Sequence, residues 1–486
     1  MVVGAGLAGL SAACHLVADG HDVTVVERED GPGGRNGVLR ADGFTFDTGP
    51  TVLTMPGLVE RALDKVGGSL APLGLRRLDP GYRAFFADGS RIDVRASVPD
   101  MTKELERSTS AADAAAFPEF VRWLERLYDV EVPNFIERNF DNPLDLLSNP
   151  LAAARLVRLG AFGRLGKAVR RRFEDERLVR LFTFQAMYAG LAPDDALALY
   201  AVITYMDSVS GVWFPAEGMH AVPTALADAL ASAGADLRYA TPAERLLTDA
   251  QGRVAGVQAG GEKLAADAVV LTVDLPDAYR RLLPDLRPPK QAVKGSYSPS
   301  AAVWHLGVRG APPDFAAHHN IHFGDAWESA FDQLIKRKEL MTDPSRLVTV
   351  PSMDAPGMAP AGHSVLYVLE PVPNLAGATD WKAEGPRLRE RLLGFLQREG
   401  YPTDLVTEEL VTPADWASQG LVAGTPFSLA HSFLQTGPFR PSNVERRRPG
   451  TFFAGTGTHP GVGIPMVLIS GELAARRVRD YLGGAR

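Results

Sequence analysis

The amino-acid sequence predicts an α/β protein, and three features of its 486 residues indicate this class. Near the N-terminus, a short apolar strand precedes a glycine-rich loop, an alanine-rich helix and a second strand that ends at Glu27. In the middle, a strand leads into a β-hairpin around residues 250–252 and a further strand at 268–272. Near the C-terminus, a second glycine-rich loop enters a helix from Pro465 to about Leu482. Because strands alternate with helices, we expect a parallel sheet flanked by helices.

The first glycine-rich loop has the spacing of a dinucleotide-binding unit of the Rossmann type. Gly4 permits the tight turn, Gly6 lets the backbone approach a pyrophosphate, and Gly9 lets the helix pack on the strand. The helix N-terminus presents oriented N–H groups to the anion, and Glu27 is placed to accept hydrogen bonds from ribose hydroxyls. An ordinary glycine-rich turn is the weaker alternative. The predicted contacts are Gly4, Gly6, Leu7, Ala8, Gly9 and Glu27.

The next stretch favours FAD over NAD as the dinucleotide. Gly33, Gly34 and Arg35 follow soon after Glu27 and Arg28. The predicted cofactor site includes all five residues. A second backbone turn and a guanidinium can neutralise more of an extended pyrophosphate. The alternative for the glycine pair is a surface turn, since Gly31 and Pro32 stand beside it.

Several segments resemble one family along most of the chain. The stretch from Gly4 to Arg35 resembles the FAD-binding start of the glutathione-reductase-type flavoproteins, especially their amine oxidase and carotenoid desaturase branches. Residues 46–51, Phe-Asp-Thr-Gly-Pro-Thr, and residues 182–219 are similar to the desaturase branch. Residues 450–470 resemble the bacterial-type phytoene dehydrogenase pattern and form the most specific match.

This resemblance implies further cofactor residues. The helix that begins at Pro465 would point its N-terminus at the flavin, where it stabilises negative charge on the reduced ring. His459 is either catalytic or held by the backbone, with neither role favoured. Thr456, Glu217 and Met466 depart from the family pattern, in which smaller residues are usual. The implied cofactor residues are Gly49, Pro50, Thr51, Ala243, Gly455, Thr456, Gly463, Ile464, Pro465 and Met466.

The resemblance also implies a reaction, the desaturation of a carotenoid polyene. Such a hydrocarbon has no hydrogen-bonding groups, so recognition must come from a long apolar tunnel. A carboxylate would stabilise positive charge on the hydrocarbon and take the released proton. By its place in the segment Asn-Pro-Leu-Asp-Leu-Leu, Asp145 is the catalytic candidate; an acid at the N-terminus of a helix is the equally favoured alternative.

Two other functions remain open at this stage. The first keeps the flavin and changes the reaction, to that of an amine oxidase, a carotenoid isomerase or a saturase. The second is a prenyl-binding protein on the same fold, which would use no flavin. For the desaturase, a quinone or oxygen is the expected electron acceptor.

Composition and charge limit the partners. A net charge of -7 argues against nucleic acid, and the single cysteine, Cys14, excludes a cysteine-based zinc site, so no metal is expected. Residues 151–173 carry seven basic and no acidic residues with apolar residues near helical spacing. This pattern indicates a membrane-surface helix, with a core-packed helix as the alternative. The expected location is cytoplasmic and peripheral to the membrane.

The order of the segments predicts three parts. Residues 1–70, 215–290 and 440–486 should form the FAD-binding domain. Residues 70–100 and 291–439 should form a substrate-binding domain with a mixed sheet, and residues 101–214 a helical, membrane-facing part.

Overall fold

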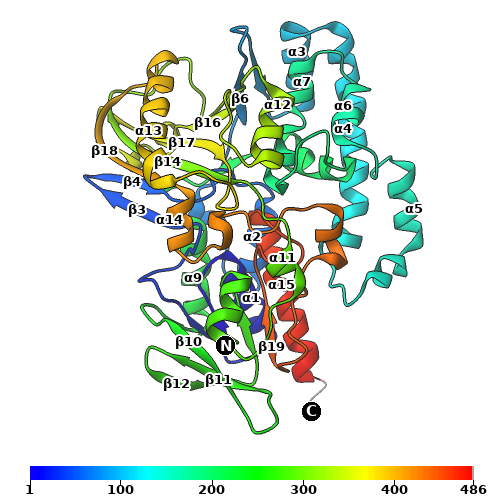
Figure 1. Ribbon diagram of the computed structural model, residues 1–486, viewed down its shortest axis with the longest axis vertical. Coiled ribbons are helices and arrows are strands. Elements are labelled where there is room, and N and C mark those ends of the chain that lie inside the picture. Colours follow the sequence, from blue (N-terminus) through cyan, green and yellow to red (C-terminus); the bar gives the residue numbers. More distant parts are fainter. Residues whose placement is uncertain (484–486) are drawn as a thin grey trace.

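The computed structural model describes residues 1–483 of the chain (Figure 1). A parallel sheet lies at the lower end in Figure 1, a larger mixed sheet lies at the upper left, and helices fill the right-hand side. Strand β1 (Val2–Val3) and helix α15 (Ile464–Gly483) lie together at the lower end, so both ends of the described chain belong to the same part.

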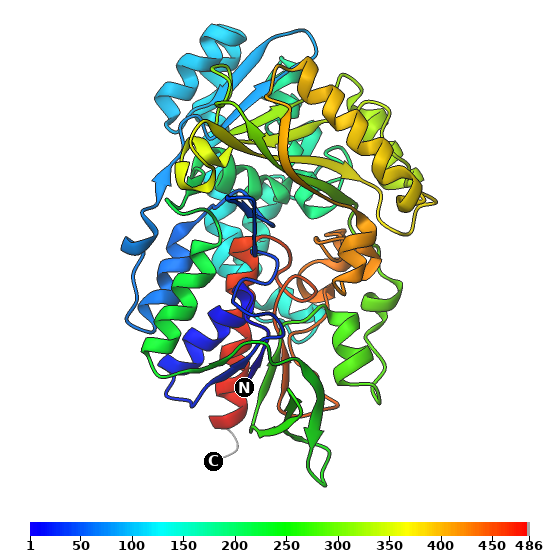
Figure 2. The same ribbon diagram turned by 90° about the vertical axis from the view of Figure 1, so that its left-hand side faces the viewer.

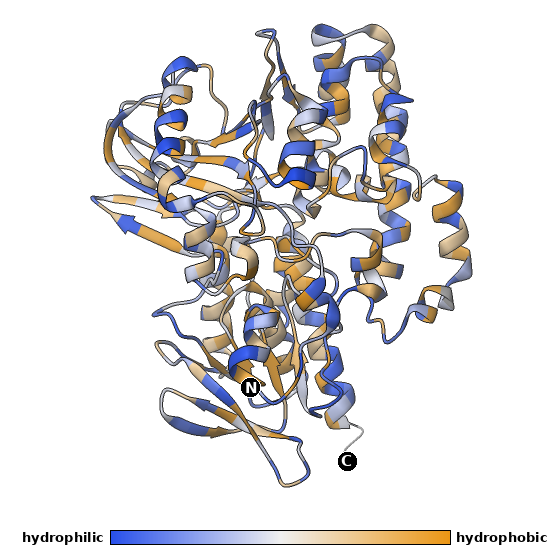
Figure 3. Ribbon diagram, viewed as in Figure 1, coloured by the Kyte–Doolittle hydropathy of each residue, from blue (hydrophilic) through white to orange (hydrophobic). Residues whose placement is uncertain are grey.

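The parallel sheet has five strands within the described residues, and all but its edge strand, Asp236–Arg238, are almost fully buried. All neighbouring strands run parallel, and Val2 pairs with both Val25 and Val270. Its strands are mostly valine, leucine and phenylalanine, which is typical of parallel strands covered on both sides (Figure 3). The order is β19 (Thr451–Phe453), β13 (Val269–Leu271), β1, β2 (Thr24–Val26) and β9 (Asp236–Arg238).

Two helices from opposite ends of the sequence pack closely on this sheet. Helix α1 (Leu7–Ala18) lies beside α15 (Figure 2), and the Ser11 hydroxyl donates to the Leu468 carbonyl at 2.7 Å. A Cβ atom at Gly471 would lie 2.3 Å from the carbonyl oxygen of Ala8, so only glycine allows this approach. The same part holds α2 (Pro56–Asp64) and α9 (Ala221–Ser232), and the antiparallel strands β10 (Ala243–Thr248), β11 (Val254–Ala259) and β12 (Glu262–Ala265).

The mixed sheet has seven strands in the described chain, with one parallel pair, β15–β6. Helix α13 (Trp381–Arg398) covers its outer face (Figure 2), where Leu388 and Leu392 pack on Trp304. The order is β18 (Asp404–Val411), β14 (Ser300–Arg309), β17 (His363–Val372), β16 (Arg346–Thr349), β15 (His319–His322), β6 (Tyr82–Phe85) and β7 (Arg91–Val94). Short pairs are β3 (Val38–Ala41) with β4 (Phe44–Asp47), and β5 (Arg76–Arg77) with β8 (Trp213–Phe214).

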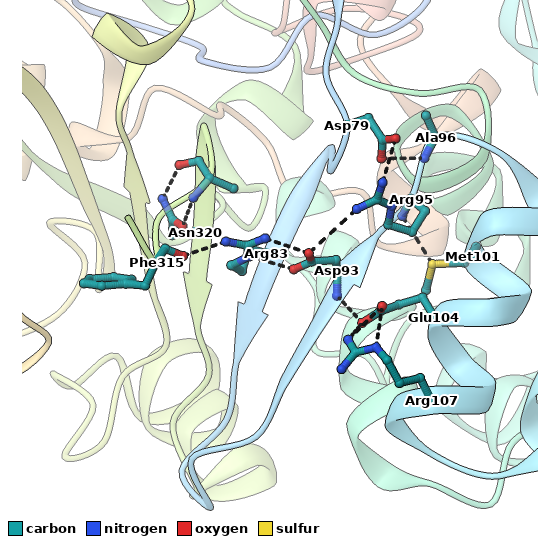
Figure 4. A network of polar contacts seen from close by, with 11 residues as sticks. Asp79, Arg83, Asp93, Arg95, Ala96, Met101, Glu104, Arg107, Phe315 and Asn320 are labelled. Carbon is teal, nitrogen blue, oxygen red and sulfur yellow. Dashed lines mark hydrogen bonds and ion pairs between the residues drawn. The ribbon is translucent and has the colours of Figure 1, made fainter. Parts of the chain in front are cut away.

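An ion-pair network attaches β6 and β7 to their surroundings (Figure 4). The Arg83 guanidinium donates two hydrogen bonds of 2.7 Å to the Asp93 carboxylate and one to the Phe315 carbonyl. The Asp93 backbone N–H donates to Glu104 of α3 (Val98–Ser108) at 3.1 Å. The edge of the mixed sheet is thereby joined to the first helix of the helical part.

The helical part lies between β7 and β8 in the sequence and forms the right-hand side of Figure 1. Its longest helix, α4 (Ala111–Glu131), continues into a π-helical turn, Val132–Ile136, and α8 (Ala201–Thr204) continues into another, Tyr205–Val209. No helix in residues 1–483 is long and apolar enough to span a bilayer. The remaining helices are α5 (Pro150–Arg158), α6 (Leu165–Arg170), α7 (Glu176–Leu181), α10 (Leu275–Asp277), α11 (Lys290–Lys294), α12 (Trp327–Phe331) and α14 (Pro413–Ser418).

The predicted basic helix over residues 151–173 is broken. Helix α5 ends at Arg158 and α6 begins at Leu165, because Gly160 adopts a φ of 76°, which stops a right-handed helix. The hairpin at 250–252 and the C-terminal helix occur as predicted. The strands of the parallel sheet all come from the three segments assigned to the FAD-binding domain, although the domain limits themselves stay a prediction.

Candidate active site

One cavity of about 1370 Å³ runs between the parallel sheet, the mixed sheet and the helical part. Its volume exceeds the roughly 300–1,000 Å³ of a site for a single small ligand. One end is lined by glycine-rich loops from both ends of the chain, and the other by apolar side chains of the helical part. The cavity therefore has room for a large cofactor and a large substrate together.

The first glycine-rich loop is folded as its spacing predicts. The Gly4 N–H donates to the Val26 carbonyl at 2.8 Å, and the φ of 105° at Gly4 is one that side chains rarely allow. A Cβ at Gly9 would lie 2.0 Å from the Gly4 carbonyl oxygen, so Gly9 serves the packing of α1 and does not line the cavity. No side chain caps the N-terminus of α1, where Gly6 is the N-cap residue. Its free N–H groups suit a phosphate anion.

The Glu27 carboxylate is hydrogen-bonded to the backbone of this loop. Its carboxylate accepts hydrogen bonds from the backbone N–H groups of Ala5 at 2.7 Å and Glu29 at 3.1 Å, and its side chain lines the cavity. The carboxylate therefore fixes the conformation of the loop. The sequence predicted only its contact with the ribose. A carboxylate oxygen has two lone pairs, so these bonds leave room for a ribose hydroxyl.

The second turn lies directly against the first loop. The Gly33 N–H donates to the Ala5 carbonyl at 2.9 Å, and Gly33 and Gly34 have φ values of 132° and 57°. The Arg35 guanidinium donates to the Thr456 hydroxyl at 2.8 Å, while its Nε is buried with no partner in the described residues. Burial lowers the pKa of Arg35, although nearby Asp274 opposes this shift. The loops at the two ends of the chain thus meet through Arg35 and Thr456.

The C-terminal loop leads into α15 beside the same cavity. Gly463 has a φ of 108°, and Pro465 occupies the first turn of α15, where its missing N–H costs nothing. The ring Nε2 of His459 lies 3.2 Å from the Ile136 carbonyl oxygen, and burial lowers the pKa of His459 to about 4. Of the two roles that the sequence left open for His459, catalytic or held by the backbone, this contact corresponds to the second.

The residues present fit FAD. The uncapped N-terminus of α1 and the unpartnered Nε of Arg35 both offer donors to a pyrophosphate, and the glycines leave space for a close backbone approach. Of the predicted cofactor residues, all but Gly9 line the cavity, including Arg28, Pro50, Thr51 and Ala243. The structure brings them together, and their individual contacts with FAD stay predictions.

Asp145, the catalytic candidate from the sequence, does not line the cavity. Its carboxylate caps a short helix by accepting from the N–H groups of Asp141 at 2.6 Å and Asn142 at 3.1 Å. These bonds lower the pKa of Asp145. The structure thus matches the alternative interpretation, an acid at the N-terminus of a helix, because the Asp145 carboxylate is bonded to the backbone of the same turn.

Sequence reasoning missed two buried carboxyl groups that do line the cavity. Glu131 is 4% exposed and Asp207 is 3% exposed, and both lie in π-helical junctions of the helical part. Neither takes part in an ion pair within the described residues. No local motif marks them, since only the packing of distant segments brings them to the cavity.

Comparison with known proteins gives consistent matches. The model of the flavin containing amine oxidoreductase family matches residues 7–479. The chain is 51% identical to a phytoene dehydrogenase of Streptomyces griseus, over 98% of this chain and 94% of that protein. It is 38% identical to a zeta-carotene-forming phytoene desaturase of Myxococcus xanthus, over 99% and 94%. An oxidoreductase structure from Methanosarcina mazei has a TM-score of 0.64 at 18% identity, covering 97% of this chain and 98% of that one.

Proposed function

Because the chain belongs to the flavin containing amine oxidoreductase family, in its phytoene desaturase branch, we propose that it is an FAD-dependent carotenoid desaturase. This family membership confirms the resemblance inferred from the sequence. The observation that carries the proposal is the single cavity that joins the dinucleotide-binding loops to an apolar chamber. Bound FAD supplies the acceptor for a hydride from the substrate.

The residues of this chain supply binding, orientation and exclusion of water. The loops at Gly4, Gly33 and Gly455 surround the cofactor end of the cavity. The opposite end is lined by side chains such as Leu156, Phe162 and Phe439, which have no hydrogen-bonding groups. Burial of a long polyene along these side chains provides affinity at about 25 cal/mol per Å² of apolar surface.

Desaturation of phytoene tests the proposed function directly. Purified protein reconstituted with FAD and given liposomal phytoene should form products with longer conjugation, seen by absorbance and chromatography. Assays under argon, with and without an added quinone, would separate a quinone from oxygen as the electron acceptor. A protein that binds FAD but leaves phytoene unchanged would contradict the proposal, and a colourless protein that takes up no FAD would favour the prenyl-binding alternative.

We also propose that the apolar end of the cavity docks on a membrane. A set of exposed apolar side chains, here called the apolar rim, comes from the short helix 143–148, α5, the loop after α5 and the short helix 433–435. Phe162 and Phe433 of the rim also line the cavity. The rim consists of Leu144, Leu151, Val157, Phe162, Phe433 and Leu434, exposed by 47–75%.

Exposed apolar patches of this kind mark contact surfaces, and the substrate of a carotenoid desaturase dissolves in lipid. Helix α5 projects from the right-hand side of the molecule in Figure 1, and it carries both rim residues and the exposed cations Arg155 and Arg158. Apolar side chains beside cations are typical of surfaces that lie on anionic bilayers. A peripheral location at the membrane follows from this docking.

A further inference from the structure

Glu131 and Asp207 are unusual in the wall of a cavity that binds a hydrocarbon. Their neighbours in the wall include Val202, Ile203 and Met206, which are apolar. A buried carboxyl group without a partner costs free energy, and a polyene gains nothing from it in binding. The presence of two such groups therefore points to chemistry.

Both carboxyl groups are next in sequence to residues that pack near the start of α15. Glu131 ends α4 where the π-helical turn begins, and Asp207 lies inside the second π-helical turn. The residues next to them, Val132 and Met206, pack in one apolar cluster with Met466 of α15. Turns of the π type inside helices occur frequently at functional sites. The two segments thus converge on the loop assigned to the flavin.

Their polar surroundings differ. Tyr82, Tyr188 and Gln185 are neighbours of Asp207, and Tyr188 also lines the cavity, but neither carboxylate oxygen of Asp207 has a hydrogen-bond partner in the described residues. Burial raises the pKa of Asp207 to about 7, with Tyr82 and Gln185 opposing the shift. Burial alone raises the pKa of Glu131 well above its usual range. Of the two groups, Asp207 is therefore the one whose carboxylate can form near neutral pH and take a proton.

We propose that Asp207 is the proton acceptor of the desaturation, an inference that rests on the proposed function. One substrate carbon loses hydrogen as a hydride, and those two electrons reduce the bound FAD. The adjacent carbon loses a proton to the Asp207 carboxylate, and the electron pair of that C–H bond becomes the second bond of the new double bond.

Replacement of the carboxylate by its amide tests this assignment. D207N should lower kcat by at least about 100-fold, within the range for loss of a general base, while FAD content and phytoene binding are kept. D207E, which restores a carboxylate, should regain at least about a tenth of the wild-type kcat. The control is D113N, because Asp113 is 2% exposed and outside the cavity; it should keep turnover per bound FAD.

Two further measurements do not depend on the folding of D207N. In the wild type, kcat should rise with pH through about 7 and then level off, because the carboxylate form is the active one. The infrared band of a protonated carboxyl group in the FAD-loaded wild type should titrate near the same pH, and this band should shift in D207E.

The outcomes separate the two proposals. If the wild type desaturates phytoene and D207N does so within threefold, Asp207 is not the acceptor and the desaturase function stands. A flat pH profile, or the lack of a titrating carboxyl band near pH 7, would overturn the assignment in the same way. If the wild type leaves phytoene unchanged, the proposed function fails and the assignment fails with it.

Discussion

Glu27 connects the sequence motif to the shape of the cofactor loop. We predict that Glu27→Gln weakens FAD binding, because an amide nitrogen cannot accept the bonds that the carboxylate receives from Ala5 and Glu29. A charge-assisted hydrogen bond contributes about 1.5–3 kcal/mol, so the Kd for FAD should rise roughly 10–100-fold. Titration of apoprotein with FAD measures this change. Glu60→Gln, at an exposed position on α2, is the control, and equal Kd values for the two variants would contradict the prediction.

The buried side chain of His305 makes the free energy of unfolding depend on pH. It is 1% exposed, and burial lowers its pKa to about 4, below the ordinary value of about 6.5. The unfolded chain therefore binds the extra proton first as pH falls. The stabilisation from neutral His305 is complete above about pH 6.5 and is lost as pH falls toward 4.

We predict that His305→Phe reduces this loss, because phenylalanine has no proton to bind and fits beside Phe46 and Tyr367. Each pKa unit corresponds to about 1.4 kcal/mol. Urea unfolding at pH 7 and pH 4.5 measures the effect: the free energy of unfolding of the variant should fall less than that of the wild type. Equal decreases in both proteins would rule out His305 as a source of acid sensitivity.

Residues in the glycine-rich loops could be predicted because a local backbone turn fixes them. Gly4 and Gly33 adopt φ values that require glycine, and the spacing alone reveals this. Asp207 could not be found this way, since its environment comes from Tyr82 and Tyr188, which are distant in sequence. Asp145 matched a family position, but its carboxylate is used by the backbone beside it.

The contact between helices α1 and α15 supports the glycine-rich loops that line the cofactor end of the cavity. We predict that Gly471→Ala destabilises the protein by about 1–3 kcal/mol, because the added methyl would overlap the Ala8 carbonyl in a packed interface. Thermal unfolding with bound FAD measures the change. Gly57→Ala is the matched control: no atom lies within 4 Å of its Cβ on α2, so it should stabilise slightly. Similar shifts in both variants would contradict the packing argument.

Helices could be predicted where the apolar pattern continues over many residues, as in α15. The basic stretch of residues 151–173 shows the opposite case, because helical spacing continues through Gly160 while the backbone does not. Three of its cations also have partners in the fold, and the first, Arg164, donates to the Asp195 carbonyl at 2.5 Å. Arg170 donates to Asp194 at 2.7 Å, and the Arg172 guanidinium lies 4.0 Å from the Trp123 ring centroid. These partners lie outside the segment, so its sequence could not reveal them.

At the scale of the whole molecule, the cavity reaches from the parallel sheet to the apolar rim, so the orientation of the protein on a bilayer would set how substrate enters. The exposed cations of residues 151–173 whose side chains have no hydrogen bond or ion pair in the described residues are Arg155, Arg158, Lys167 and Arg171. Cations near an anionic surface contribute about 1 kcal/mol each. In the proposed docking, these cations would add their charge to the contacts of the apolar rim.

We therefore predict that replacing Arg155, Arg158, Lys167 and Arg171 by glutamine weakens binding to anionic vesicles at least tenfold at low salt. FAD content should stay unchanged, because these side chains do not line the cavity. Vesicle sedimentation measures the binding. In 1 M salt the difference should shrink, since the Debye length falls to about 3 Å. The control replaces Lys382 and Arg387, which are exposed on α13 at the far side of the molecule (Figure 1). If both sets of variants bound vesicles as the wild type does, the face around α5 would not be the docking surface, and the substrate would have to enter the cavity from elsewhere.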